Sequence, residues 1–128
     1  MNECRRQQSS NPGSLPGFVH GDIQPLISIL DENVEWSNYE DNPLNGTVHG
    51  PEAVTEFMES LGQMEFNRFK VVSVMSDGDK VIGVIDATYT VKSTGKSHSG
   101  IAAHLFEFQD GKMVRFREVA ATSADAWE

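Results

Sequence analysis

The chain has 128 residues, an apolar fraction of 38% and a formal net charge of −9, values that predict one globular, water-soluble domain. No stretch approaches the ~20 consecutive apolar residues of a membrane-spanning helix, so no membrane partner is expected. Lys and Arg are absent between Arg6 and Arg68, which argues against nucleic acid as a partner because nucleic-acid affinity depends on cationic contacts.

The N-terminal segment differs in composition from the rest of the chain. Residues 1–17 are rich in Ser, Pro and Gly, which indicates a tail, and residues 18–128 are expected to form the single domain. Cys4 is the only cysteine, and no apolar signal segment follows it. These features predict a cytoplasmic protein without an internal disulfide.

Helical signals dominate the first half of the predicted domain. Asp22 is expected to open a short helix from Ile23 to about Leu30, a strand is predicted around residues 34–36, and a polar loop over residues 38–49. The strongest helix begins at Gly50-Pro51. Its apolar stripe has helical spacing and consists of Val54, Phe57, Met58 and Leu61.

Strand signals with a period of two dominate the second half. One predicted strand begins at Phe66 and turns Phe69, Val71 and Met75 to the same face, and the next runs over residues 81–92. Helices followed by a long meander predict an α+β fold, in which helices cover the concave face of a strongly curved antiparallel or mixed sheet. Such an arrangement leaves a conical pocket between the sheet and the helices.

The hairpin over residues 104–118 places two titratable side chains on an otherwise apolar strand face. Its turn is Asp110-Gly111, and alternation puts His104 and Glu118 on the phenylalanine-rich face of the two arms. A buried His or Glu is costly unless it is paired or neutralised. We therefore predict that these two residues lie opposite each other and serve a purpose beyond folding.

Six short motifs follow one another along the chain: Gly21-Asp22-Ile23, Asp31–Trp36, His49–Val54, Asp77–Val81, Thr94–Lys96 and Phe106–Val114. Their order and spacing resemble the SnoaL-like, ketosteroid-isomerase-like branch of the NTF2-like superfamily over about residues 18–124. The resemblance implies a cone-shaped α+β barrel with a cavity for a small, mostly apolar molecule. It also implies that no cofactor is obligatory and that the chain forms a homodimer through the sheet.

The catalytic residues of the resembled families are only partly present here. In ketosteroid isomerases a tyrosine and an acid form an oxyanion hole and an aspartate is the base, and the matching positions here are Ser14, His104 and Trp36. Steroid isomerisation by that mechanism is therefore not expected. In SnoaL-type polyketide cyclases an aspartate of the last strand is the acid/base, and Glu118 falls at or beside that position.

The first functional hypothesis is a cofactor-independent acid/base enzyme: an isomerase, a cyclase or an epoxide-hydrolase-like enzyme. It would act on a small apolar carbonyl or epoxide compound. Glu118 would carry the proton, with its pKa raised by burial, and His104 would be its partner or the oxyanion donor. The residues expected to shape the ligand pocket are Trp36, Tyr89, Phe106 and Phe116.

Less specific interpretations compete with each of these assignments. Under these interpretations, Glu118 is a solvated carboxylate or pairs with Arg115 or Arg117, and His104 is a hydrogen-bonded core residue. The aromatic residues are then ordinary members of the core. The chain would then be a non-catalytic module that binds a small ligand or a protein through its cone, or an interaction domain with a filled core. No metal site is expected, because His98 and His104 are ~20 Å apart along one strand.

Overall fold

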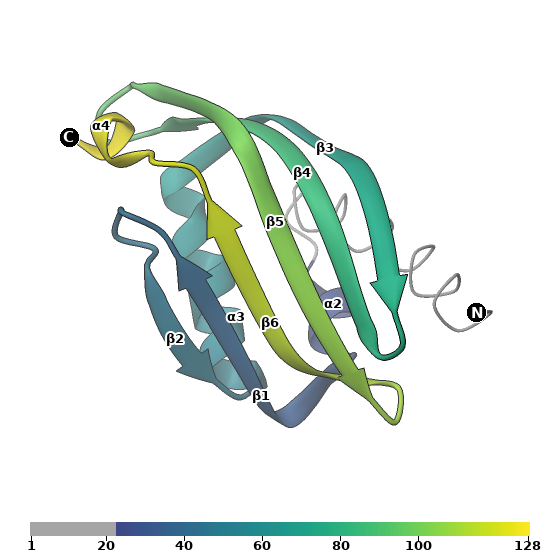
Figure 1. The fold of residues 1–128 in the computed structure, drawn as a ribbon. Coiled ribbons are helices and arrows are strands. Elements are labelled where there is room, and N and C mark those ends of the chain that lie inside the picture. Colours follow the sequence, from purple (N-terminus) through teal and green to yellow (C-terminus); the bar gives the residue numbers. More distant parts are fainter. Residues whose placement is uncertain (1–22) are drawn as a thin grey trace.

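A strongly curved six-stranded sheet with helices on one face organises residues 23–128, the part of the chain that the computed structural model describes (Figure 1). The predicted tail over residues 1–17, the predicted start of the domain at residue 18, and Asp22 lie outside the described residues. The helices and strands are α2 (Gln24–Ile27), β1 (Leu30–Tyr39), β2 (Gly46–His49), α3 (Pro51–Ser60), a 3₁₀ turn (Leu61–Gln63), β3 (Met64–Asp77), β4 (Lys80–Val91), β5 (Ser97–Gln109), β6 (Lys112–Ala120) and α4 (Ala124–Trp127).

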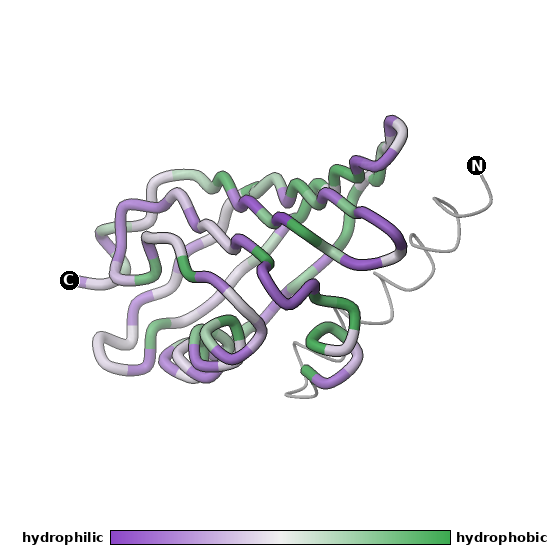
Figure 2. Tube along the Cα trace, turned by 90° about the horizontal axis from the view of Figure 1, so that it is seen from below, coloured by the Kyte–Doolittle hydropathy of each residue, from purple (hydrophilic) through white to green (hydrophobic). Residues whose placement is uncertain are grey.

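The sheet is mixed and open. Its strand order is β2-β1-β6-β5-β4-β3, and all neighbours are antiparallel except β1 and β6, which run parallel. Seen along the sheet, α2 and α3 lie on the same side of it (Figure 2). The predicted α+β class, with helices against one face of a curved mixed sheet, is confirmed.

Helix α3 follows directly from its sequence. Gly50 precedes it with a φ of 89°, a conformation that glycine adopts without steric cost, and Pro51 occupies the first helical position, where its missing N–H is no loss. Val54 and Met58 point into the core, and Glu52 lies in the first turn, where the helix dipole favours a negative charge. The helix predicted from the apolar stripe is therefore confirmed.

Two predicted boundaries in the first half are wrong. The polar loop predicted over residues 38–49 is shorter, because β1 continues to Tyr39 and residues 46–49 form β2. The first helix ends at Ile27 instead of Leu30, because Leu30 already pairs with Met113 of β6. In both places backbone pairing with a distant strand outweighs local composition.

Strand irregularities change which side chains face inward. The pairing of β3 with β4 shifts between Val71 and Ser73, so the prediction that Met75 shares a face with Phe69 and Val71 is wrong, and its side chain is 52% exposed. A similar shift follows Glu107 in the pairing of β5 with β6, and Met113 rather than Val114 is fully buried there. An extra residue in one strand reverses the alternation beyond it.

The core divides into two apolar clusters. The larger consists of Leu26, Leu30, Val34, Trp36, Val54, Met58, Val81, Phe106, Phe108, Met113 and Phe116. The smaller lies against α4 and consists of Leu44, Met64, Tyr89, Val91 and Ala126. Members of both clusters line one pocket on the concave side of the sheet.

Candidate functional site

The pocket has aromatic walls. The side chains predicted to shape it, Trp36, Tyr89, Phe106 and Phe116, all line it and are at most 8% exposed. Trp36 stacks on Phe116 with ring centroids 3.9 Å apart, because parallel register places the two residues side by side on β1 and β6. These contacts make a rigid apolar surface on which a planar ligand can lie.

His104 and Glu118 face each other across β5 and β6 and also line this pocket. His104 Nε2 is 2.7 Å from Glu118 Oε2, and the two side chains are only 8% and 19% exposed. The other ring nitrogen, Nδ1, is buried without a hydrogen-bond partner among the described residues. A carboxylate beside one nitrogen fixes the tautomer that leaves the lone pair on the other.

Two further polar residues complete the site, and sequence reasoning missed both. Asn38 Nδ2 donates a hydrogen bond of 2.9 Å to Glu118 Oε1, and the side chain of Glu40 is hydrogen-bonded to Glu118 as well. Both residues lie in the segment that the composition predicts to be a polar loop. The signal was nevertheless present, because Trp36, Asn38 and Glu40 are spaced by two and therefore share one face of an extended strand.

Glu118 is ionised, contrary to the prediction that burial raises its pKa. Burial acts to raise the pKa of Glu118, but the hydrogen bond from His104, the positive charge that this imidazole carries when it is protonated, and the hydrogen bonds of Glu40 and Asn38 outweigh burial and lower the pKa to about 2. Each of these contacts favours the charged form. Glu118 therefore holds no proton to give at neutral pH.

The carboxyl group that retains a proton is Glu40. Burial, together with the hydrogen bond and the negative charge of Glu118, raises its pKa to about 8, although a hydrogen bond from Asn42 acts in the opposite direction. Two carboxyl groups in contact cannot both ionise readily, so the pair holds one proton near neutral pH, and that proton resides on Glu40. The protonated Glu40 donates its hydrogen bond to the Glu118 carboxylate.

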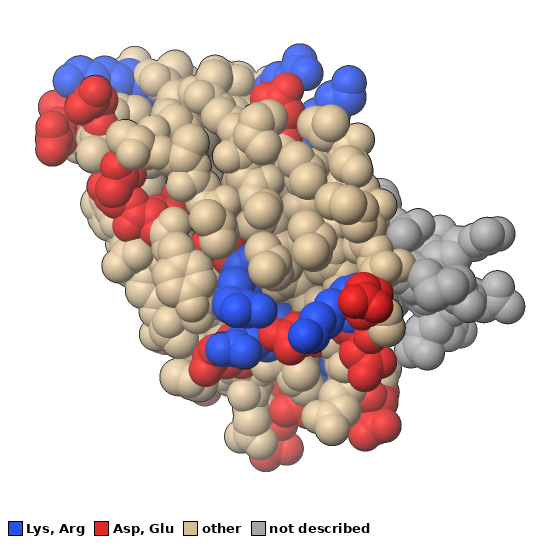
Figure 3. Space-filling view, in the orientation of Figure 1, with Lys and Arg blue, Asp and Glu red and all other residues tan. Residues whose placement is uncertain are grey.

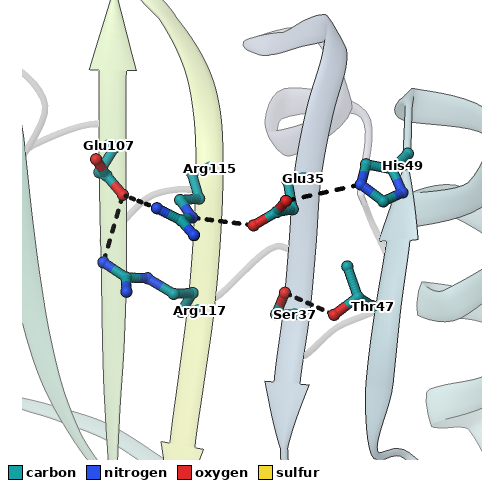
Figure 4. Close-up of polar contacts among 7 residues, drawn as sticks. All are labelled: Glu35, Ser37, Thr47, His49, Glu107, Arg115 and Arg117. Carbon is teal, nitrogen blue, oxygen red and sulfur yellow. Dashed lines mark hydrogen bonds and ion pairs between the residues drawn. The ribbon is translucent and has the colours of Figure 1, made fainter.

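The arginines of β6 do not neutralise Glu118. Arg115 Nε is 3.0 Å from Glu35, and Arg117 is 3.4 Å from Glu107. Together with the contacts of Arg115 with Glu107 and of His49 with Glu35, these pairs form a ladder across β5, β6, β1 and β2 (Figure 4). The competing interpretation, in which Glu118 pairs with a neighbouring arginine at the rim, is therefore wrong.

Within residues 23–128, no group of three or more His, Cys, Asp or Glu side chains is arranged to hold a metal ion. No helix in this part of the chain is long and apolar enough to span a membrane. A protonated carboxyl group (Glu40), a carboxylate (Glu118) and an imidazole (His104) lie beside an apolar pocket. Together these groups can transfer protons.

Solved structures share this fold. An NTF2-like protein from Burkholderia xenovorans superimposes with a TM-score of 0.81 at 21% identity, over 91% of this chain and 90% of that one. A candidate isomerase from Rhodopseudomonas palustris has a TM-score of 0.71 at 24% identity, over 83% and 82%. A candidate SnoaL-like polyketide cyclase from Mesorhizobium loti has a TM-score of 0.72 at 17% identity, over 88% and 97%.

No curated protein matches the sequence. The family model of the SnoaL-like domain matches residues 15–116, which is most of the chain. Together with the cone-shaped fold shared with NTF2-like structures, this match shows that the chain belongs to the SnoaL-like domain family.

Proposed function

We propose that this protein is a cofactor-independent acid/base enzyme acting on a small apolar carbonyl or epoxide compound. The observation that carries the proposal is the opposed pKa shifts of two touching carboxyl groups, to about 8 for Glu40 and about 2 for Glu118. Environments that separate the pKa values of two neighbouring acids are typical of acid/base sites. The apolar pocket beside them supports a ligand of the same character.

Each polar residue has a distinct role in the proposed reaction. Glu40 is the general acid that donates a proton to a carbonyl or epoxide oxygen. His104 is the base in its neutral form, in which the Glu118 carboxylate holds Nε2–H and Nδ1 carries the lone pair. In an isomerisation, His104 removes a proton next to the carbonyl while Glu40 protonates its oxygen, and His104 then returns the proton to another carbon of the enol as Glu40 recovers its own. In epoxide opening, His104 deprotonates the attacking water.

The ligand-binding residues, the cofactor requirement and the oligomeric state are proposed by analogy with the family. We propose that the aromatic residues Trp36, Tyr89, Phe106 and Phe116 hold the ligand, that proton transfer alone requires no cofactor, and that the protein is a cytoplasmic homodimer. The outer face of the sheet supports association, because it exposes Tyr39 and Val119 at half of their surface or more. Much of this face is free of charge (Figure 3).

Hydrogen exchange into a panel of small apolar ketones in D₂O, together with opening of aryl epoxides, tests the proposal. NMR should detect deuterium next to the carbonyl, or a diol, with the wild type. Rates should fall by about 10²- to 10⁴-fold in Glu40→Gln and His104→Ala. The wild-type rate should also decline above about pH 8, where Glu40 loses its proton.

Glu59→Gln is the matched control, because Glu59 lies on the exposed side of α3. Unchanged rates in Glu40→Gln and His104→Ala would eliminate the proposed mechanism. Saturable binding of these compounds without turnover would instead support a non-catalytic module that binds small ligands through its cone.

A further inference from the structure

The pocket continues beyond Glu118 toward α4 along a single row of β5 residues. His98, Gly100, Ala102 and His104 occupy every second position, and all of them line the pocket. The two histidines are six positions apart, which corresponds to ~20 Å of strand. One pocket therefore has an imidazole at each of two well-separated positions.

Small side chains occupy four positions of the wall between these histidines, beside the larger Ile85, which pairs with Ala102, and Phe69, whose ring centroid lies 6.4 Å from that of His104. Ala87 of β4 pairs with Gly100, and Ala120 of β6 pairs with Ala102. All four residues line the pocket. Small apolar side chains leave space above the sheet, so this middle section suits the apolar body of an elongated molecule.

Within residues 23–128, the Tyr89 hydroxyl has a donor but no acceptor partner at the α4 end of the pocket. Its side chain lines the pocket and is 8% exposed. Trp127 Nε1 donates a hydrogen bond of 3.3 Å to the Tyr89 hydroxyl oxygen. Because Tyr89 is the acceptor in that bond, its own hydroxyl proton is still available for another acceptor.

His98 lies beside Tyr89 in a position that a glycine makes accessible. The rings of His98 and Tyr89 have centroids 5.5 Å apart. A Cβ atom on Gly100 would be only 2.9 Å from His98 Nε2, so any larger residue would displace the imidazole. Glycine weakens the interior of a strand, and its presence there often marks such a close approach.

We propose that Tyr89 and His98 form a second polar subsite for a hydroxyl or carbonyl oxygen at the far end of an elongated, apolar ligand. The proposal deepens the proposed function and rests on it for the reactive end, where a carbonyl or epoxide group lies against Glu40, Glu118 and His104. The substrate class is thus a molecule with oxygen functions at both ends and an apolar centre.

Two rigid probes long enough to reach both ends test this subsite: 4-acetyl-p-terphenyl, with one oxygen function, and 4-acetyl-4″-hydroxy-p-terphenyl, with one at each end. Dissociation constants follow from quenching of the chain's two tryptophans. The wild type should bind the hydroxylated probe about tenfold more tightly, the effect of one additional hydrogen bond in a buried site. Tyr89→Phe, His98→Ala and Gly100→Ala should each reduce this preference.

Matched controls exist for all three variants. Tyr39 is half exposed, His49 is on β2 outside the pocket, and a Cβ on Gly62 meets no atom within 4 Å. Tyr39→Phe, His49→Ala and Gly62→Ala should therefore keep the preference.

Equal affinity of the wild type for both probes, or a preference that survives Tyr89→Phe and His98→Ala, would overturn the proposed subsite. Because the readout is equilibrium binding, it is independent of turnover. A preference without catalysis would contradict only the proposed enzyme activity, and catalysis without a preference only the subsite.

Discussion

Glu40 and Glu118 are the same residue type in contact, yet they hold opposite charge states. Glu118 receives hydrogen bonds from Asn38 and Glu40 and contacts His104, all of which favour its anion. Glu40 has that anion as its neighbour, and its own charge is therefore disfavoured. The difference arises from the surrounding side chains and not from the residue itself.

Replacing Glu40 by Gln should stabilise the protein at mildly alkaline pH. The pKa of Glu40 rises from 4.5 to about 8 on folding, so between these values the folded state retains a proton that the unfolded state has lost. Wild-type stability therefore decreases as the pH rises through this range. Glu40→Gln, which keeps a hydrogen-bond donor, should gain up to about 2 kcal/mol over the wild type near pH 8, after allowance for solvent screening.

Urea unfolding of both proteins from about pH 5 to about pH 8 measures this difference. The exposed Glu59→Gln variant should follow the wild type at every pH. A constant difference between Glu40→Gln and the wild type would show that Glu40 is ionised throughout the range.

Replacing Glu118 by Gln should have the opposite pH signature. The pKa of Glu118 falls from 4.5 to about 2 on folding, so its contribution is present above about pH 4.5 and is lost as the pH falls through about 2. Glu118→Gln should cost about 1–3 kcal/mol at neutral pH, since it removes a charged hydrogen-bond partner of buried His104.

Acid unfolding followed by circular dichroism measures the effect. The destabilisation caused by Glu118→Gln should shrink as the pH approaches 2. Glu32→Gln, at an exposed position of β1, serves as the control. A destabilisation independent of pH would mean that Glu118 acts through packing rather than through its charge.

At the scale of elements, hydrogen bonds connect the loop after β1 to the start of the short helix α4. Asn42 Nδ2 contacts both Glu40 Oε1, at 3.0 Å, and Ser123 Oγ, at 2.7 Å. Asp41 accepts a 2.9 Å hydrogen bond from the Ser123 backbone N–H, and bonds of this kind lower the pKa of Asp41. The helix at the end of the chain thereby helps to position the proton donor of the site.

Ser123→Ala should weaken this connection. Ser123 is 4% exposed, and loss of its hydroxyl leaves Asn42 with one fewer partner, which should cost about 1 kcal/mol. Urea unfolding measures the loss, and the exposed Ser93→Ala variant should be neutral. The alkaline decline of the catalytic rate should also shift in Ser123→Ala if Asn42 then turns away from Glu40. If Ser123→Ala and Ser93→Ala are equally stable, α4 does not help to position Glu40.

At the scale of the whole molecule, the two faces of the sheet differ in character. The concave face carries the pocket and the helices, and the outer face carries the ion-pair ladder and exposed apolar side chains (Figures 3 and 4). Tyr39 and Val119 are neighbours in the register of β1 and β6 and are 50% and 51% exposed. Apolar groups that cluster on one face favour association.

The proposed homodimer therefore predicts a specific variant. Val119→Glu places a charge beside Tyr39 on the outer face and should convert a dimer into a monomer, as measured by light scattering during size-exclusion chromatography. Glu52→Gln, on exposed α3, should leave the mass unchanged. A wild type that is monomeric at high micromolar concentration would contradict the proposed association.

The sequence by itself determined the fold class, the long helix α3, the β5–β6 hairpin and the opposition of His104 and Glu118. These features depend on local periodicity and turn residues, which a single segment contains. The tertiary structure alone decided that β1 reaches Asn38 and runs parallel to β6, and that Glu40 contacts Glu118. Glu118 is ionised and Glu40 is protonated because residues far apart in the chain meet, and no local pattern of charges contains that information.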